Sequence, residues 1–200
     1  MADQSGGIRI WNLKGELLKY VQKRNPDGSF DSKSFFSVDW HPSKPIILTG
    51  GDEIRMHDTS GNELKRIPHR KEYTALLTVD WHPSGTFFAT ADYGHEKEGI
   101  PTLLQLWKED GGLIKTIKDS HAEYRNIRWN KDGSLLATAS DLLRIHDADG
   151  RLLYSSQLAD ELLWGLAWNS TGSLLVTTSN RNHVHIWNNK AELVKKRFNS

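Results

Sequence analysis

The chain has 200 residues, long enough for one domain or at most two, and its 26 basic against 25 acidic side chains give a net charge of +1 at pH 7. This balance excludes the excess of positive charge that is typical of a protein with a nucleic-acid or anionic-lipid partner. The absence of cysteine excludes disulfides, thiolate zinc sites and a cysteine nucleophile. Neither a long apolar stretch nor a signal-peptide pattern occurs, so the sequence predicts a cytoplasmic location with no membrane partner.

The first patterned segment is IRIWNLKGEL at 8–17, an alternating apolar run that ends at Trp11 and is followed by a turn with Gly15. The same pattern returns further along the chain, at 54–64, 104–113, 143–152 and 184–193. A second pattern, first seen as FSVDWHPSKPIILTG, stands between these copies at 36–50, 77–91, 125–139 and 164–178. The chain is therefore built from internal repeats.

Each repeat predicts four short strands. The first strand alternates apolar residues up to a tryptophan, and the second is an apolar run such as PIILTG, typical of a strand buried on both faces. The third strand ends at the position of Trp11, and the fourth is more polar, as an outer edge should be. Because no helical periodicity is sustained, we expect an all-β fold and a single domain over 1–200. It would contain a half unit and four complete units, at 8–24, 33–69, 73–118, 122–158 and 162–198.

Two copies of the third-strand pattern contain a His-Asp pair, in RMHDTSG at 55–61 and in RIHDADG at 144–150. His57 and His146 are in register with the tryptophans of the other copies, such as Trp107. A buried imidazole can pack and donate one hydrogen bond much as an indole does. We therefore interpret both histidines as core residues that replace tryptophan, and not as members of a catalytic dyad.

Other patterns give little support for catalysis or metal binding. His183 and His185 are two residues apart on a predicted strand and point to one face, as a metal pair would, but the spacing supplies no third ligand. We therefore interpret them as polar residues at the start of a strand. The sequence contains no Walker A loop, dinucleotide fingerprint, nucleophile elbow or HExxH motif. It predicts no catalytic residue, no metal ligand and no cofactor.

A unit of about 40 residues with four strands and a tryptophan closing the third strand is the pattern of a propeller blade. In this the chain resembles the WD40-repeat family from Ile8 to about Phe198, with the degenerate dipeptides WN, HD, WK, HD and WN at the signature position. The resemblance implies a WD40-type β-propeller with four complete four-stranded blades and an N-terminal half blade.

The WD40 pattern often links a His, a Ser or Thr, an Asp and the third-strand Trp of one blade by hydrogen bonds. His121 and Ser140 match two of these positions, but the tryptophan position of that blade is His146. In the last blade Arg181 stands where the Asp is expected. We therefore expect no blade to contain a complete tetrad, and packing to hold the blades together.

Two features depart from the repeat and predict a binding surface. The insertion DYGHEKEGIPT at 92–102 lies in a loop of the class that the resemblance implies is used for partners. Trp164 is the one tryptophan outside the two repeat positions, and Phe36, Leu77 and Arg125 are its counterparts at the starts of the other inner strands. With their neighbours, these residues should ring the mouth of a central channel, where aromatic and arginine side chains are typical anchors. The predicted partner-binding residues are Trp164, Tyr124, Arg125, Tyr73, Phe35, Tyr93 and His95.

The favoured function is a non-enzymatic scaffold that binds a protein or peptide at its loop-bearing face and channel mouth. Two alternatives stay open: an enzyme that uses the channel mouth for a small molecule, and an architectural part of a larger protein. Because four and a half blades leave apolar faces and a strand edge uncovered, we expect either a fragment of a longer propeller or self-association. The simplest assembly is a homodimer that completes a ring of about eight blades. A less expected solution is a four-bladed ring in which the N-terminal strand pair displaces the C-terminal one.

Overall fold

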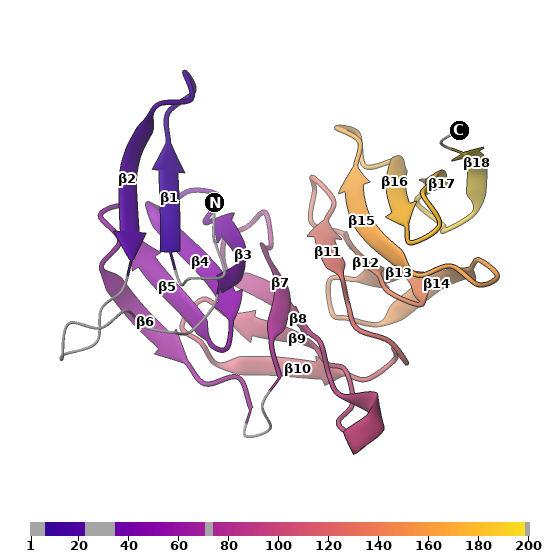
Figure 1. Ribbon diagram of the computed structural model, residues 1–200, viewed down its shortest axis with the longest axis horizontal. Helices are drawn as coiled ribbons and strands as arrows, with labels where there is room; N and C mark the ends of the chain where they lie inside the picture. The colour runs from indigo at the N-terminus through magenta and orange to yellow at the C-terminus, as the bar shows by residue number, and fades with distance from the viewer. Residues whose placement is uncertain (1–6, 23–34, 71–73, 199–200) are drawn as a thin grey trace.

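The computed structural model describes residues 7–22, 35–70 and 74–198, which form eighteen strands and one short 3-10 turn (Figure 1). The strands make five antiparallel sheets, one of two strands and four of four strands. The hairpin contains β1 (Gly7–Trp11) and β2 (Leu17–Gln22). The first four-stranded sheet contains β3 (Phe35–Trp40), β4 (Ile46–Gly51), β5 (Ile54–Asp58) and β6 (Glu63–Ile67).

The other three sheets repeat this arrangement. The second contains β7 (Leu76–Trp81), β8 (Phe87–Asp92), β9 (Leu104–Lys108) and β10 (Leu113–Ile117). The third contains β11 (Asn126–Trp129), β12 (Leu135–Ala139), β13 (Leu142–Asp147) and β14 (Leu152–Gln157). The fourth contains β15 (Leu163–Trp168), β16 (Leu174–Ser179), β17 (His183–Asn188) and β18 (Leu193–Phe198). The all-β prediction, with four complete blades and a half blade, is confirmed. None of the described residues belongs to a helix long and apolar enough to cross a membrane.

The blades follow one another along an open arc (Figure 1). Their inner strands are neighbours in chain order, since β3 contacts β7, β7 contacts β11 and β11 contacts β15. The β1–β2 hairpin lies at one end of the arc and the β15–β18 sheet at the other. The last sheet keeps its own outer strands, because β16 pairs with β17 and β17 with β18. The alternative in which the N-terminal pair displaces them is therefore wrong.

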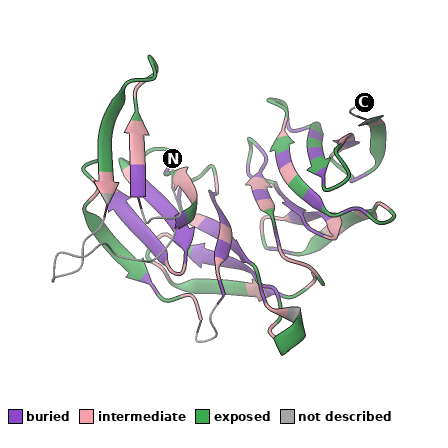
Figure 2. Ribbon diagram, in the orientation of Figure 1, coloured by how far each residue is buried: buried purple, intermediate pink, exposed green. Residues whose placement is uncertain are grey.

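The hydrophobic cores lie between consecutive blades. Middle strands such as β4 and β8 are buried on both faces from their second residue onward (Figure 2). One core joins Leu48 and Ile54 of the first complete blade to Val79, Trp81 and Phe88 of the second. Equivalent cores join the second blade to the third and the third to the fourth. Each blade therefore depends on its neighbours for the burial of its faces.

Hydrogen bonds also cross the blade contacts, in addition to the packing that the sequence predicted. The Asp39 carboxylate accepts the backbone N–H of Trp81 at 2.7 Å, and the Asp80 carboxylate accepts that of Trp129 at 2.7 Å. Arg128 lies 3.2 Å from the other oxygen of Asp80. Burial nevertheless dominates and raises the pKa of Asp80 to about 7. The blades are thus joined by desolvated carboxylates.

The outward face of the last blade has no such carboxylate at the corresponding position. Ala167 takes the strand position that Asp80 occupies in the second blade, and it is exposed. Along β16, Leu174 and Val176 are 38% and 36% exposed, whereas Ala89 on β8 is fully buried. The outward face of the last sheet, defined here by Ala167, Leu174, Val176 and Ile186, is therefore an apolar surface without a covering blade.

Replacing Asp80 by Asn should stabilise the fold more at about pH 8.5 than at about pH 5.5. The folded-state pKa is raised from 3.8 to about 7, so the contribution of Asp80 to the stability of the fold is fully present below pH 3.8 and is lost as the pH rises through 7. Asn keeps an acceptor for Trp129 without the buried charge. The increase in unfolding free energy on substitution should be larger at pH 8.5 than at pH 5.5 by on the order of 1–3 kcal/mol. Chemical denaturation at the two pH values measures it.

The control is Asp149→Asn, at an exposed turn position. Comparing each variant with the wild type at the same pH cancels the titration of the remaining groups. A gain from Asp80→Asn that is equal at both pH values would contradict the assigned burial effect.

Candidate functional site

His57 occupies the tryptophan slot of its blade, as the sequence predicted. In the second blade the indole N–H of Trp107 donates to Thr90 Oγ1 at 3.0 Å. In the first blade His57 Nε2 lies 3.3 Å from Oγ1 of Thr49, the equivalent threonine, and its side chain is buried. Asp58 instead accepts hydrogen bonds from the turn that follows. The pair is not a catalytic dyad.

His146 fills the same slot with a different partner. It is fully buried and its Nε2 lies 2.7 Å from Asp119 Oδ2. Thr138, which would accept an indole N–H in this blade, has no hydrogen-bond partner for its hydroxyl. Asp147 binds the backbone and side chain of Arg151 in the next turn. A His–Asp pair therefore exists here, and it joins the connection before β11 to strand β13.

Replacing His57 by Ala should lower the free energy of unfolding by about 2–4 kcal/mol, because it leaves a cavity between blades. His57→Trp should keep the fold, since the slot accepts indole in two other complete blades. Thermal and urea denaturation measure both effects. His121→Ala is the matched control, because His121 is exposed and should change stability by less than about 0.5 kcal/mol. Equal stability of His57→Ala and the wild type would refute the core role.

The family tetrad is replaced by other buried polar groups. In the second blade, buried Asp92 lies 2.9 Å from His69 Nε2 and 3.0 Å from Arg70. The Trp107–Thr90 hydrogen bond stands beside this cluster as a separate pair. In the third blade Ser140 hydrogen bonds Ser120, and His121 is exposed. The sequence analysis matched His121 to the histidine position of the tetrad and did not identify His69, which occupies the same connection one blade earlier.

Trp164 on β15 and Arg125, which immediately precedes β11, are exposed and lie together. Trp164 is 51% exposed, and the Arg125 guanidinium carbon lies 5.4 Å from the centre of its ring. This distance is within the range of a cation–π contact. Phe36, the counterpart of Trp164 in the first complete blade, is also exposed. These residues place aromatic and cationic groups on the surface of the fold.

Two predicted anchors are buried, and the expectation that they bind a partner is corrected. Tyr124 is fully buried and its hydroxyl donates to Asp119. Phe35 is 4% exposed and packs edge-on against His57, with ring centroids 5.7 Å apart. The reason is strand alternation: each precedes an exposed residue and therefore points to the opposite face. Tyr73 lies outside the described residues.

The insertion forms a pocket beside the third blade. It contains the short turn η1 (Glu96–Glu98), and His95 pairs with Ile100 across its neck. Gly94 has φ 61°, and a Cβ there would lie 2.8 Å from the Thr102 backbone nitrogen, so the neck requires glycine. The pocket has a volume of about 200 Å³ and is lined by Tyr93, His95, Thr102, His121, Ala122 and Glu123.

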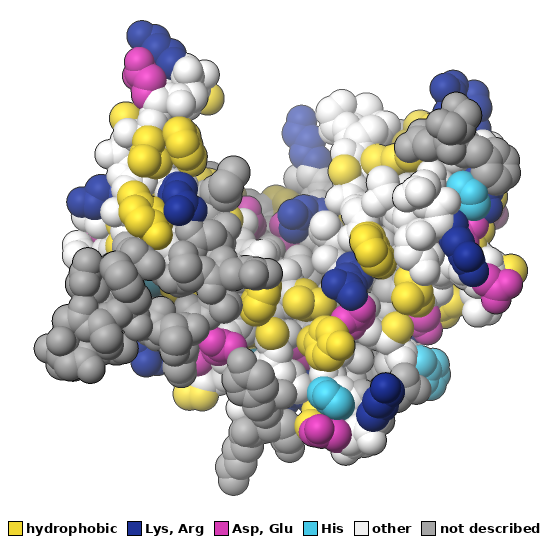
Figure 3. Space-filling view, viewed as in Figure 1, with side chains coloured by type: hydrophobic (Ala, Val, Ile, Leu, Met, Phe, Trp, Pro, Cys, Tyr) yellow, Lys and Arg dark blue, Asp and Glu magenta, His cyan; other side chains and the backbone are white. Residues whose placement is uncertain are grey.

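This pocket is continuous with the Arg125–Trp164 pair. Glu123 lines the pocket and accepts a hydrogen bond from the Arg125 guanidinium, which stacks with Trp164. We call these residues together the rim surface: Tyr93, His95, Thr102, His121, Glu123, Arg125 and Trp164. Around η1, hydrophobic, histidine, acidic and basic side chains lie close together (Figure 3). The rim surface can therefore receive both an apolar side chain and polar groups.

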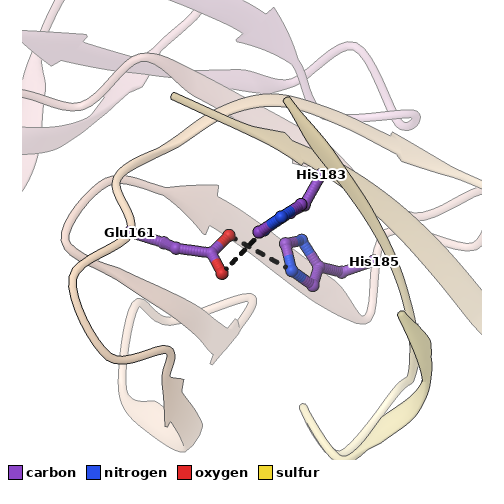
Figure 4. A group of neighbouring side chains, drawn as sticks. All are labelled: Glu161, His183 and His185. Carbon is purple, nitrogen blue, oxygen red and sulfur yellow. Dashed lines mark hydrogen bonds and ion pairs between the residues drawn. The ribbon is translucent and has the colours of Figure 1, made fainter. Parts of the chain in front are cut away.

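A second polar site is buried in the last blade. The Glu161 carboxylate lies between the imidazoles of His183 and His185 (Figure 4). Ser179 donates to Glu161 Oε2 at 2.7 Å, and Lys196 lies 2.5 Å from Oε1. Although burial opposes it, these contacts lower the pKa of Glu161 to about 2, and the carboxylate is ionised. The sequence could not reveal Glu161, because it comes from the connection before β15.

Comparison with known proteins finds similarity to WD-repeat proteins. The family model "WD domain, G-beta repeat" matches residues 159–188. Mouse F-box-like/WD repeat-containing protein TBL1X is 32% identical over 73 residues, which is 36% of this chain and 12% of that protein. The probable cytosolic iron-sulfur protein assembly protein 1 of Candida glabrata is 25% identical over 115 residues, 52% of this chain and 34% of that protein. The matches therefore span about a third or less of these relatives.

A solved structure shows the same fold over nearly the whole chain. A chain in the crystal structure of the mitotic checkpoint complex superimposes with a TM-score of 0.78 at 16% sequence identity. The superposition covers 98% of this chain and 59% of that chain. The blades described here thus match 59% of a longer chain that has the same fold.

Proposed function

Because this chain belongs to the WD40-repeat family of β-propellers, we propose that it is a non-enzymatic scaffold that binds a protein or peptide segment at the rim surface. The observation that carries the proposal is the exposed Trp164, stacked with Arg125 beside the pocket of the insertion. A fold of this kind gives no function by itself, so the argument depends on this surface.

The rim surface has the composition of a binding hot spot. Tryptophan and arginine are enriched among the residues that contribute most to protein interfaces. Here the Trp164 indole is half exposed on a strand, so its position is fixed before a partner arrives. A rigid anchor loses little side-chain entropy on binding. Trp164 would bind an apolar side chain of the partner, and the adjacent pocket would hold the flanking peptide.

The charges of the surface favour a peptide over a polyanion. Glu123 pairs with the guanidinium of Arg125, so the most exposed cation of the surface is already neutralised. His95 likewise lies 3.9 Å from Glu98. A nucleic-acid site requires several cations aligned with phosphates. The balanced pairs instead fit a peptide that carries apolar groups and charges of both signs.

Replacing Trp164 by Ala should weaken partner binding by about 1–3 kcal/mol, and so should Arg125→Ala. The partner is first captured with the wild-type chain and identified by mass spectrometry. Its affinity for each variant is then measured by calorimetry. Leu64→Ala is the matched control, because Leu64 is 56% exposed on the outer strand β6 and far from the rim surface in the fold. Wild-type affinity in both rim variants would place the binding site elsewhere.

Deleting residues 94–100 should change partner affinity without unfolding the second blade. The segment is closed at its neck by the His95–Ile100 bridge, and most of its described side chains are exposed or half-buried. The loss of His95, and of the loop that positions Tyr93, should weaken binding, while circular dichroism and the melting temperature stay close to the wild type. If the deletion variant unfolds, the milder substitutions Tyr93→Ala and His95→Ala test the pocket instead. Wild-type affinity in both of these variants would argue against binding at the pocket.

We further propose that two copies of the chain associate through the open ends of the arc. The outward face of the last sheet exposes Leu174 and Val176. At the other end Trp11 and Trp40 are 46% and 49% exposed, and a cavity of about 200 Å³ lies between the hairpin and the first complete blade. Apolar faces at two ends of one molecule favour association of copies into a closed ring.

Light scattering at micromolar concentration tests the association. We expect a mass near twice the 22.8 kDa of one chain, and Val176→Lys should shift it toward the mass of one chain. Leu64→Lys controls for added charge at an exposed apolar residue outside the open ends. A wild type of about 23 kDa at these concentrations would reject self-association.

A further inference from the structure

The buried polar site of the last blade brings together three groups that bind metals. His183 and His185 are two residues apart on β17, so both side chains lie on one face of the strand. Glu161 comes from the connection between β14 and β15 and reaches that face from the neighbouring segment (Figure 4). Folding therefore supplies the third ligand that the His-Val-His spacing lacks.

The separations of the three groups bracket those expected around a small tetrahedral ion. His183 Nδ1 lies 2.9 Å from Glu161 Oε1, and His185 Nε2 lies 3.3 Å from Oε2. One ligand atom from each residue lies within 4.8 Å of the others. Zinc binds nitrogen and oxygen at about 2.0–2.2 Å, which places the ligands of a tetrahedral ion roughly 3.3 Å apart. Two imidazoles and one carboxylate with an open fourth position are a common zinc ligand set.

His185 provides a second, independent observation. Its side chain is fully buried; Nδ1 makes no hydrogen bond, and Nε2 faces Glu161 Oε2 at 3.3 Å without hydrogen-bond geometry. Buried polar atoms without partners are rare in folded proteins and cost stability. A metal ion bound to Nε2 would satisfy the nitrogen that faces Glu161. From this geometry we propose that Glu161, His183 and His185 form a zinc-binding site.

Lys196 is the group that zinc would have to displace. It lies opposite His185 in the β17–β18 pairing, and its ammonium is 2.5 Å from Glu161 Oε1. Its side chain is 29% exposed, so the flexible stem can carry the charge out to water. Zinc would then replace one cation on Glu161 with another, and the two compete for the same carboxylate.

Zinc would join the β14–β15 connection to strand β17. An ion bound there would hold two segments that are 22 positions apart in sequence and would raise the stability of the folded state. At zinc concentrations about 100-fold above the dissociation constant, the melting temperature should rise by roughly 5–10 °C.

The test is calorimetric titration of the full chain with zinc, before and after substitution. We expect one ion per chain, and Glu161→Gln or His183→Gln should weaken binding at least about tenfold. Lys196→Met should tighten binding, because it removes the competing ammonium. Cobalt provides a spectroscopic readout, since a tetrahedral cobalt ion on this ligand set absorbs strongly in the visible range.

The control is a His95→Ala, His121→Ala double variant, which removes two other histidines that share the pocket of the insertion. It should bind zinc like the wild type. Melting each variant without zinc shows whether it is folded. The proposal is overturned if the folded Glu161→Gln and His183→Gln variants bind zinc as tightly as the wild type, or if Lys196→Met weakens binding.

Discussion

The structure depends on one constraint: a blade cannot bury both faces of its middle strands without a neighbour on each side. Leu48 on β4 and Ala137 on β12 are fully buried because consecutive sheets pack against each other. Val176, at the equivalent position of the last blade, is exposed because no sheet follows it along the arc. The stability of a blade is therefore set largely by its contacts, as in other repeat proteins. The uncovered ends are the direct consequence.

The same constraint explains why polar side chains occur at the blade contacts. A backbone N–H at the end of an inner strand, such as that of Trp81, is enclosed by the preceding blade and needs an acceptor there. Asp39 provides it, although burial raises the pKa of its carboxyl. His41 makes a further contact between blades: its Nε2 lies 3.0 Å from the carbonyl oxygen of Gly85, in the β7–β8 turn of the next blade. These links fix the relative position of blades more precisely than apolar packing alone would.

The sequence predicted the parts of the fold that the repeat register determines. The strand order, the blade limits and the core roles of His57 and His146 all follow from aligning copies. The sequence-based prediction failed where a shift of one position along the chain decides which face a side chain points to. Tyr124 and Phe35 were expected at the rim, but their neighbours Arg125 and Phe36 are the exposed members of each pair. The contact of Glu161 with His183 joins residues 22 positions apart through a loop, and no periodic pattern encodes it.

The two sites of the last blade are mechanically connected. Glu161 and Trp164 belong to one short segment, and between them Leu163 is fixed by a hydrogen bond from its N–H to the carbonyl oxygen of Ser140 at 2.8 Å. A group that binds Glu161 therefore also restrains the strand that presents Trp164. The proposed zinc ion and the proposed partner would therefore act on one continuous segment of the chain, from Glu161 to Trp164.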